Sequence, residues 1–267
     1  MSGMDIFETP PPAPQTPVTE TQPQRKISGA AVMAAIALIV SVAALVNTSR
    51  GSTSTSDQDS SPAGAVDLYR QPDNVRDIIE TARKSLVQIK CAGGLGSGFA
   101  YSINEGDSQY PTTIVTNHHV IEDCLSDESQ LSVYYGEDYA QLASSKIYNS
   151  DETNDLAIID ISAEMPVFEN ASEEPQPGHW TMAIGHPAGD IEEALHDSVT
   201  FGNLVAREAE YYNYTTSILN PGNSGGPLLN SKGELIGINT LAGASTEFGV
   251  WNLAIDLRIL CENLYNC

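Results

Sequence analysis

The feature that most constrains the fold is a rhythm of short β-type runs across the later two thirds of the chain. From Ser85 to Ile255, stretches rich in Val, Ile, Thr and aromatic residues alternate with polar turns. Such side chains favour extended backbone, and many short strands at even spacing are typical of an all-β barrel or sandwich. The predicted strands are SLVQIKC, GSGFAYSI, TTIVTN, LSVYY, SSKIYN, LAIIDI, TMAIG, SVTFGNLV, TTSIL, PLLN, ELIGINT and GVWNLAI.

Short helices are expected at both ends of this β-rich region. A helix beginning at Asp73 places Val75, Ile78 and Ile79 on one face. The stretch from Leu257 to Tyr265 is predicted to form a closing helix that packs back on the body. We therefore expect one folded domain over residues 66–267.

The first 65 residues differ in composition from that domain. Residues 1–26 are rich in Pro, Thr and Gln and predict a disordered tail, and residues 47–65 form a Ser/Thr-rich linker. Between them, residues 27–46 carry no charge over a length that spans a bilayer core as a helix. The sequence thus predicts a transmembrane helix ahead of the domain.

The flanking residues of this apolar segment bear on its orientation. Arg25 and Lys26 precede it and Arg50 stands alone beyond it, which favours a cytoplasmic N-terminus. A signal peptide cleaved near Ala43 is the alternative. We favour an uncleaved anchor because the leading segment is long, proline-rich and partly acidic. Either interpretation places the domain outside the cytoplasm, in a periplasm or at a cell surface.

Cysteine content and charge narrow the candidate functions. An even number of cysteines in the exported part suggests two disulfides, with three pairings open on spacing alone. No Cys/His cluster has metal-ligand spacing, so we expect no metal and no cofactor. The net charge is −23, which disfavours nucleic acid as a partner. The cysteines are Cys91, Cys124, Cys261 and Cys267.

Three local patterns carry side chains that are capable of catalysis. TTIVTNHHV delivers His118 and His119 at the end of a β-branched strand, and NDLAII places Asp155 directly before an apolar strand. NPGNSGGPL sets Ser224 in a glycine turn that begins with Gly222. Taken alone, each pattern is better explained by a structural or surface histidine, a capping aspartate or a surface turn.

Together the three patterns supply what a serine nucleophile requires. A hydroxyl must lose its proton as it attacks, so an imidazole must lie within hydrogen-bond reach. A carboxylate orients that imidazole, and backbone N–H groups stabilise the oxyanion that develops. Rival carboxylates are Asp123, Asp160 and Asp197.

The motifs resemble those of one protease family. TNHHV, NDLAII, TMAIGHPAG, VTFGNLV, NPGNSGGPLLN and GELIGINT occur in the order found in HtrA/Deg-type serine proteases, which are trypsin-like enzymes of the chymotrypsin fold. The resemblance implies a double six-stranded β-barrel and a catalytic triad of His119, Asp155 and Ser224. His118 is then the neighbour of the base.

The resemblance also implies the residues that bind substrate. The oxyanion hole would be formed by N–H groups of Gly222, Asn223 and Ser224. Because Ile218 stands six residues before Ser224, where an acidic residue would select Lys or Arg, we expect small to medium aliphatic residues at P1. The substrate-binding residues would be Ile218, Leu219, Asn239, Thr240 and Leu241.

Departures from the family are expected in three places. The chain ends thirteen residues after Ala254, so no PDZ domain is expected to follow. In the double-barrel fold Cys91 and Cys124 would be adjacent and form one bridge. Cys261 and Cys267 would form the other, which requires a turn after Leu264. Members of the family often form trimers through the segment ahead of the barrel, but that segment is diverged here, so the resemblance leaves a monomer and a homo-oligomer both open.

The leading hypothesis is a membrane-anchored serine endopeptidase that cleaves extracytoplasmic proteins or peptides, in quality control or in regulation. The alternative is a non-proteolytic chaperone or binding module on a protease-like scaffold. The complete set of triad residues favours the endopeptidase.

Overall fold

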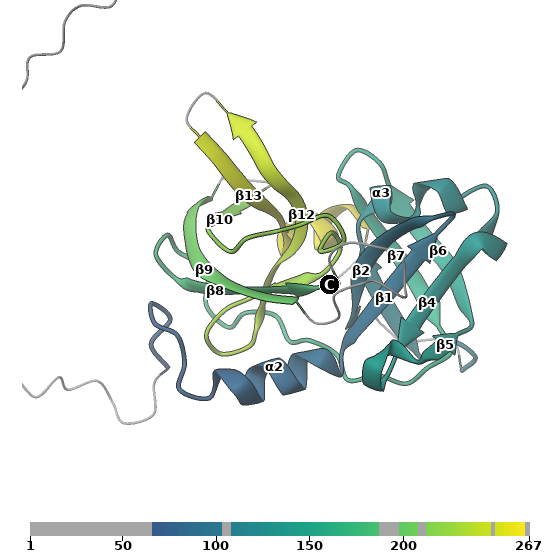
Figure 1. The fold of residues 1–267 in the computed structure, drawn as a ribbon, viewed down its shortest axis with the longest axis horizontal. Helices are drawn as coiled ribbons and strands as arrows, with labels where there is room; N and C mark the ends of the chain where they lie inside the picture. Colours follow the sequence, from purple (N-terminus) through teal and green to yellow (C-terminus); the bar gives the residue numbers. More distant parts are fainter. Residues whose placement is uncertain (1–65, 103–107, 187–197, 208–211, 247–248, 265–267) are drawn as a thin grey trace, which may run out of the picture. The chain divides into compact units, whose positions relative to one another are not determined.

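The computed structural model describes residues 66–102, 108–186, 198–207, 212–246 and 249–264. These residues form two lobes, the first built on strands between Leu86 and Ile161 and the second on strands between Trp180 and Asp256 (Figure 1). The predicted tail, transmembrane segment and linker lie outside the described residues. Within the described ranges, no helix has the length and hydropathy needed to cross a membrane.

The first lobe is a seven-stranded antiparallel sheet in the order β5-β4-β1-β2-β3-β7-β6. The inward-facing residues are branched and apolar, and β7 is buried along almost its whole length. The strands are β1 (Leu86–Cys91), β2 (Gly94–Tyr101), β3 (Thr112–Thr116), β4 (Leu131–Tyr135), β5 (Gln141–Ala143), β6 (Ser145–Asp151) and β7 (Leu156–Ile161).

The count of seven strands corrects the expected six for this lobe. The segment from Gln141 to Asp151 is interrupted at Ser144, so its first part pairs with β4 and its second part with β7. Ser144 leaves the ladder because its N–H donates to the side chain of Ser162 and its carbonyl accepts from the Ser162 N–H. The covalent continuity of β5 and β6 brings the two edges of the sheet together.

The second lobe is a closed six-stranded barrel, as expected, in the order β10-β13-β12-β11-β8-β9. One predicted strand is displaced: the strand covers Tyr212–Thr215, which pairs with both β9 and β13, and not Thr215–Leu219. Its register with β9 shifts at Thr215, and the next residue, Thr216, still donates its N–H to the Asn203 carbonyl of β9. The strands are β8 (Trp180–Gly185), β9 (Ser198–Arg207), β10 (Tyr212–Thr215), β11 (Pro227–Leu229), β12 (Leu235–Thr246) and β13 (Gly249–Asp256).

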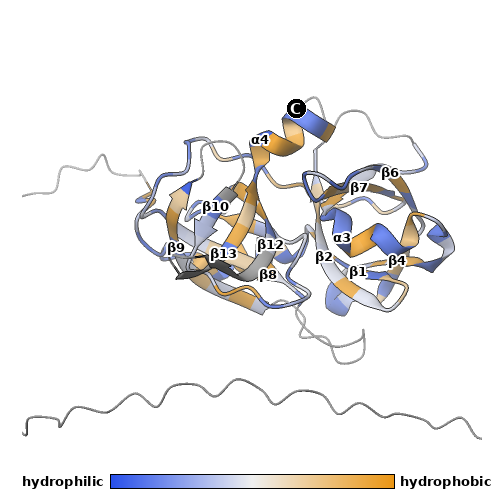
Figure 2. Cartoon of the chain, turned by 90° about the horizontal axis from the view of Figure 1, so that it is seen from above, coloured by the Kyte–Doolittle hydropathy of each residue, from blue (hydrophilic) through white to orange (hydrophobic). Residues whose placement is uncertain are grey.

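Helices flank the two lobes. Helix α2 (Val75–Arg83) buries Ile78 and Ala82 and leaves its charged face exposed. At the other end, α4 (Leu257–Ile259) continues into a π-helical turn, Leu260–Leu264. This turn contacts β6 and β7 while α4 contacts β12, so the C-terminal helix spans both lobes (Figure 2).

The largest core cluster joins the lobes. Phe99 and Leu156 of the first lobe belong to the same buried cluster as Met182 and Ile238 of the second. Figure 2 shows apolar residues along strands of both lobes. Burial of this shared apolar surface holds the lobes against each other, which fixes the loops at their junction.

Candidate active site

His119 lies in α3 (His118–Ile121), the short helix that follows β3. The strand ends at Thr116, and Asn117 adopts an extended conformation before the helix turns. The side-chain amide of Asn117 donates to the carbonyl oxygen of Asp155 at 2.9 Å. Neighbouring His118 makes a different contact, to the hydroxyl of Ser150. The structure therefore separates the two histidines, with only His119 directed at the predicted carboxylate.

Asp155 lies between β6 and β7 in a left-handed conformation with φ of 52°. Its Oδ1 accepts the backbone N–H of His119 at 3.1 Å, and both carboxylate oxygens lie 2.9 Å from His119 Nδ1. Because a carboxylate only accepts hydrogen bonds, Nδ1 carries the proton and Nε2 is left with its lone pair. A non-glycine residue in this region of backbone space is strained, and such residues gather at functional sites.

The electrostatics of this pair favour its charged form. The hydrogen bond that His119 donates to Asp155 raises the pKa of His119 above its ordinary value, against a smaller opposing effect of burial. Burial alone would raise the pKa of Asp155, but hydrogen bonds from His119 and Thr240 hold it below its ordinary value. The site therefore keeps Asp155 ionised and stabilises protonated His119.

Ser224 occupies the turn between β10 and β11. The preceding residues form a reverse turn in which Asn223 N–H donates to the Asn220 carbonyl at 2.9 Å, with Gly222 at φ of 99°. The Ser224 hydroxyl donates to the carbonyl of Thr240 at 3.1 Å. Among the described residues it makes no hydrogen bond to His119, so the structure places the serine beside the pair without engaging the imidazole.

Thr240 connects the serine to the carboxylate. Its carbonyl accepts from Ser224, and its hydroxyl donates to Asp155 Oδ2 at 2.6 Å. A chain of contacts thus runs from Ser224 through Thr240 and Asp155 to His119. Sequence reasoning assigned Thr240 only to substrate binding. No local pattern marks its contact with Asp155, because 85 residues separate the two in sequence.

Two backbone N–H groups at the turn lack a hydrogen-bond acceptor in the described structure. Within the described part of the chain, the N–H groups of Gly222 and Ser224 have no hydrogen-bond partner, whereas that of Asn223 is engaged by Asn220. Buried N–H groups are nearly always paired in proteins. Open donors on either side of Asn223 are therefore a feature of this turn that an anionic oxygen could satisfy.

The glycines after the serine are required by close backbone approach. A Cβ at Gly225 would lie 2.2 Å from both the Ser97 carbonyl oxygen and Thr116 Oγ1, and one at Gly226 would lie 2.3 Å from the Ile184 carbonyl oxygen. Gly225 also has φ of +82°. The absence of a side chain at these two positions lets the backbone of the turn pack directly against β2, β3 and β8.

The predicted substrate-binding residues have different environments. Ile218 is 60% exposed, whereas Leu219 is buried in a second-lobe cluster with Ala183 and Leu228. Asn239 is fully buried and bonds Gly225, Gly226 and Pro227 through its backbone and side chain. The side chain of Leu241 lies outside the described residues. Of the two apolar members whose side chains the structure describes, Ile218 is therefore exposed and Leu219 is buried.

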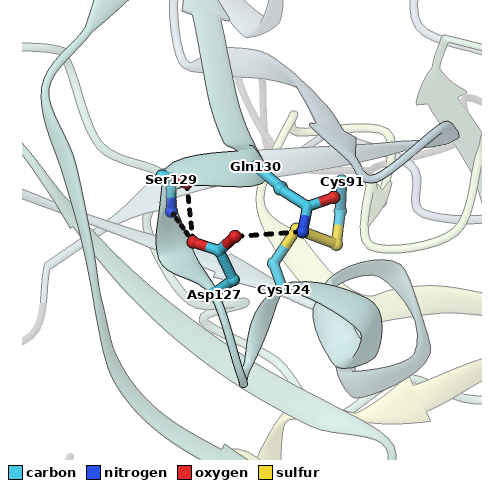
Figure 3. Close-up of a disulfide and its surroundings, with 5 residues drawn as sticks. All are labelled: Cys91, Cys124, Asp127, Ser129 and Gln130. Carbon is cyan, nitrogen blue, oxygen red and sulfur yellow. Dashed lines mark hydrogen bonds between the residues drawn. A yellow bond between two sulfur atoms is a disulfide. The ribbon is translucent and has the colours of Figure 1, made fainter.

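A disulfide braces the segment that carries His119. Cys91 at the end of β1 bonds to Cys124, five residues beyond His119 and beside the turn of Asp127 (Figure 3). This pairing was expected from the family resemblance. Cys261 is also disulfide-bonded, and Cys267 lies outside the described residues. In the described ranges, no three His, Cys, Asp or Glu side chains gather as a metal site would require.

An imidazole oriented by a half-buried carboxylate, near a serine in a glycine turn at the junction of two β-lobes, is the arrangement expected of chymotrypsin-fold serine peptidases. Residues 96–238 match the family model described as a trypsin-like peptidase domain, and the chain belongs to that family.

Named relatives agree with this assignment. The chain is 34% identical over 186 residues to a Synechocystis protein named as serine protease HhoB, covering 64% of this chain and 40% of the relative. It is 38% identical over 150 residues to a DegP-like periplasmic serine endoprotease of Chlamydia trachomatis, covering 51% of this chain and 28% of the relative. The chain therefore spans less than half the length of these relatives.

A solved structure supports the fold. The serine endoprotease of Yersinia pestis superposes with a TM-score of 0.58 at 28% identity, covering 72% of this chain and 66% of that one. The predicted resemblance to HtrA/Deg-type proteases is confirmed.

Proposed function

We propose that this chain is a serine endopeptidase in which Ser224 attacks the peptide carbonyl, His119 is the general base and Asp155 orients the imidazole. The observation that carries the proposal is the contact of both Asp155 oxygens with His119 Nδ1. It selects the tautomer whose Nε2 can accept a proton, and the raised pKa of His119 makes the imidazole a stronger base.

The reaction follows from these roles. His119 Nε2 removes the proton from Ser224 as Oγ bonds to the substrate carbonyl carbon, and the same proton passes to the leaving amine when the C–N bond breaks. Water, deprotonated by His119, then hydrolyses the acyl-enzyme and restores Ser224. We expect Ser224 to exchange the Thr240 carbonyl for the imidazole when substrate binds, because catalytic hydrogen bonds often tighten only in the complex.

The oxyanion that forms in each step needs two donors. We assign this role to the N–H groups of Gly222 and Ser224, which are open in the described structure. Asn223, the third predicted member, has its N–H engaged by Asn220, so it shapes the turn without contributing a donor.

We further propose a preference for aliphatic P1 residues. Ile218 is exposed just ahead of the nucleophile turn, where its side chain can contact an apolar substrate residue. A peptide library should show Val, Ala, Leu or Ile at P1, and a strong preference for Lys or Arg would contradict this specificity.

The cellular setting rests on the sequence of residues 27–46. We propose that this segment anchors the protein with its N-terminus in the cytoplasm and the peptidase domain outside, where it cleaves misfolded or regulatory proteins, as a monomer or a homo-oligomer. The periplasmic naming of the Chlamydia relative supports an extracytoplasmic domain.

The activity is tested with the full-length chain purified in detergent. Wild-type protein should hydrolyse casein and be labelled by a fluorophosphonate, and Ser224→Ala should lose both with its circular dichroism unchanged. Ser231→Ala is a matched control, because Ser231 is buried and donates to a backbone carbonyl away from the site. Folded wild-type protein that binds unfolded casein without cleaving or labelling would instead be a binding module.

A further inference from the structure

Ser97 is a fully buried serine of the first lobe that reaches the nucleophile turn of the second. It lies in β2 between Gly96 and Gly98, and it is 0% exposed. The hydrogen bonds from Ser97 to the turn cross the junction of the lobes. They are additional to the hydrogen bonds that pair β2 with its neighbouring strands.

The main chain of Ser97 holds one end of the turn. Its N–H donates to the carbonyl of Ser224 at 2.8 Å, and its own carbonyl accepts the Thr116 hydroxyl at 2.7 Å. The carbonyl of Ser224 is therefore anchored to β2, and the anchor is itself tied to β3, the strand that leads to His119.

The side chain of Ser97 holds the middle of the turn. Its hydroxyl donates to the carbonyl of Gly222 at 2.7 Å and accepts the backbone N–H of His186 at 2.9 Å. The Gly222 carbonyl belongs to the same peptide group as the Asn223 N–H, which donates to Asn220. Both polar ends of that peptide are thus fixed, and its plane cannot rotate without breaking a hydrogen bond.

This peptide lies between the two open N–H groups. Gly222 N–H precedes it and Ser224 N–H follows it, so its orientation sets the directions of both. We propose that Ser97 is a positioning residue whose hydroxyl aligns the two oxyanion donors and the nucleophile. This inference rests on the proposed function and adds a residue to it.

Two glycines pack closely against Ser97. A Cβ at Gly185 would lie 2.8 Å from Ser97 Oγ, and one at Gly226 would lie 3.4 Å from Ser97 Cβ. A water molecule needs more room than the removal of one hydroxyl provides at such spacing. Ser97→Ala should therefore leave the Gly222 carbonyl and the His186 N–H without this partner, and free the peptide to reorient.

The test compares Ser97→Ala with wild-type protein and with Ser231→Ala, which alters a buried serine that donates to a backbone carbonyl far from the turn. All are full-length proteins assayed with one fluorogenic peptide and with the aldehyde of the same peptide. The aldehyde forms an oxyanion by adding to Ser224, so its affinity reports the donors directly. A role limited to stability would lower the melting temperature of both variants without changing this affinity selectively.

We expect kcat of Ser97→Ala to fall about 10- to 100-fold, with KM changed by less than about threefold and aldehyde affinity reduced in parallel with kcat. Ser231→Ala should retain wild-type kcat and aldehyde affinity. Equal kcat and aldehyde affinity in Ser97→Ala and wild type would overturn the inference while leaving the proposed function intact. A folded wild-type protein with no hydrolysis would overturn both.

A second variant covers the case in which Ser97→Ala does not fold. Ser97→Cys keeps nearly the same shape but offers only a weak donor. It should fold and lose kcat and aldehyde affinity together, and wild-type values for both would overturn the inference.

Discussion

Thr240→Val isolates the hydroxyl that supports Asp155 without removing either member of the His–Asp pair. Valine has nearly the shape of threonine but cannot donate to Asp155 Oδ2, which Thr240 contacts at 2.6 Å. Hydrogen bonds to charged groups contribute about 1.5–3 kcal/mol. Because Asp155 Oδ2 keeps its contact with His119 Nδ1, we expect the loss to lie around or slightly below the lower end of this range, at about 1–2 kcal/mol.

The free energy of this lost hydrogen bond also predicts the effect of Thr240→Val on kcat. If the lost hydrogen bond stabilises the His119 imidazolium that forms in the transition state, kcat should fall about 5- to 30-fold. Thr113→Val is the matched control, because Thr113 donates to Asp160 at 3.0 Å in the same lobe but away from His119. It should lower stability by a comparable amount and leave kcat unchanged.

Urea unfolding at several pH values tests whether the Thr240 hydroxyl stabilises the ionised form of Asp155. The pKa of Asp155 is held below its ordinary value, so the stability from its hydrogen bonds is present above the unfolded value of about 3.9 and lost as pH falls through the folded value. The difference in unfolding free energy between wild type and Thr240→Val should therefore be largest near neutral pH and shrink below pH ~4. Equal kcat in wild type and Thr240→Val, or an equal loss in Thr113→Val, would refute the reasoning.

Three further predictions follow from the same contacts. The rise of kcat/KM with pH should have its midpoint above about 6.5, because Asp155 raises the pKa of His119 and the base acts only when deprotonated. The variant Asp155→Asn should lower this midpoint and reduce kcat by about 10⁴-fold. Replacing both cysteines of the first-lobe disulfide by serine should cost about 3–4 kcal/mol in urea unfolding, since the bond closes a separation of 33 residues. Gly225→Ala should abolish fluorophosphonate labelling because its Cβ would overlap backbone, whereas Gly93→Ala, with left-handed φ but open space, should lower stability without abolishing labelling.

Much of the fold was predictable from local pattern. Runs of branched and aromatic residues located most strands within one or two residues, because extended backbone and half-buried surfaces favour those side chains. The exceptions lie where side chains interrupt the ladder. Thr215–Leu219 has strand composition, yet β10 ends at Thr215 after a shift in its register with β9. β5 (Gln141–Ala143) was not among the predicted strands, and Ser144, the first residue of the strand predicted at 144–149, separates it from β6 through its bonds to Ser162.

The candidate site was partly predictable for the same reason. His119, Asp155 and Ser224 stand out because each lies at the end of a β-type run or in a glycine turn, where side chains project from a rigid scaffold. Thr240 and Ser97 carry no such signal. Their importance comes from single hydrogen bonds to Asp155 and Gly222, and such partners cannot be read from spacing along the chain.

The sequence by itself determined the strand-rich architecture, the family and the residues able to do chemistry, since these depend on composition and local periodicity. Only the tertiary structure decided which carboxylate meets His119. Asp160 pairs with Thr113 across β3 and β7, whereas Asp155 lies just before β7, opposite the end of β3 from which His119 emerges. The register between β3 and β7 therefore determines which aspartate lies next to His119. This register is fixed by the packing of the whole lobe rather than by either aspartate's neighbours in sequence.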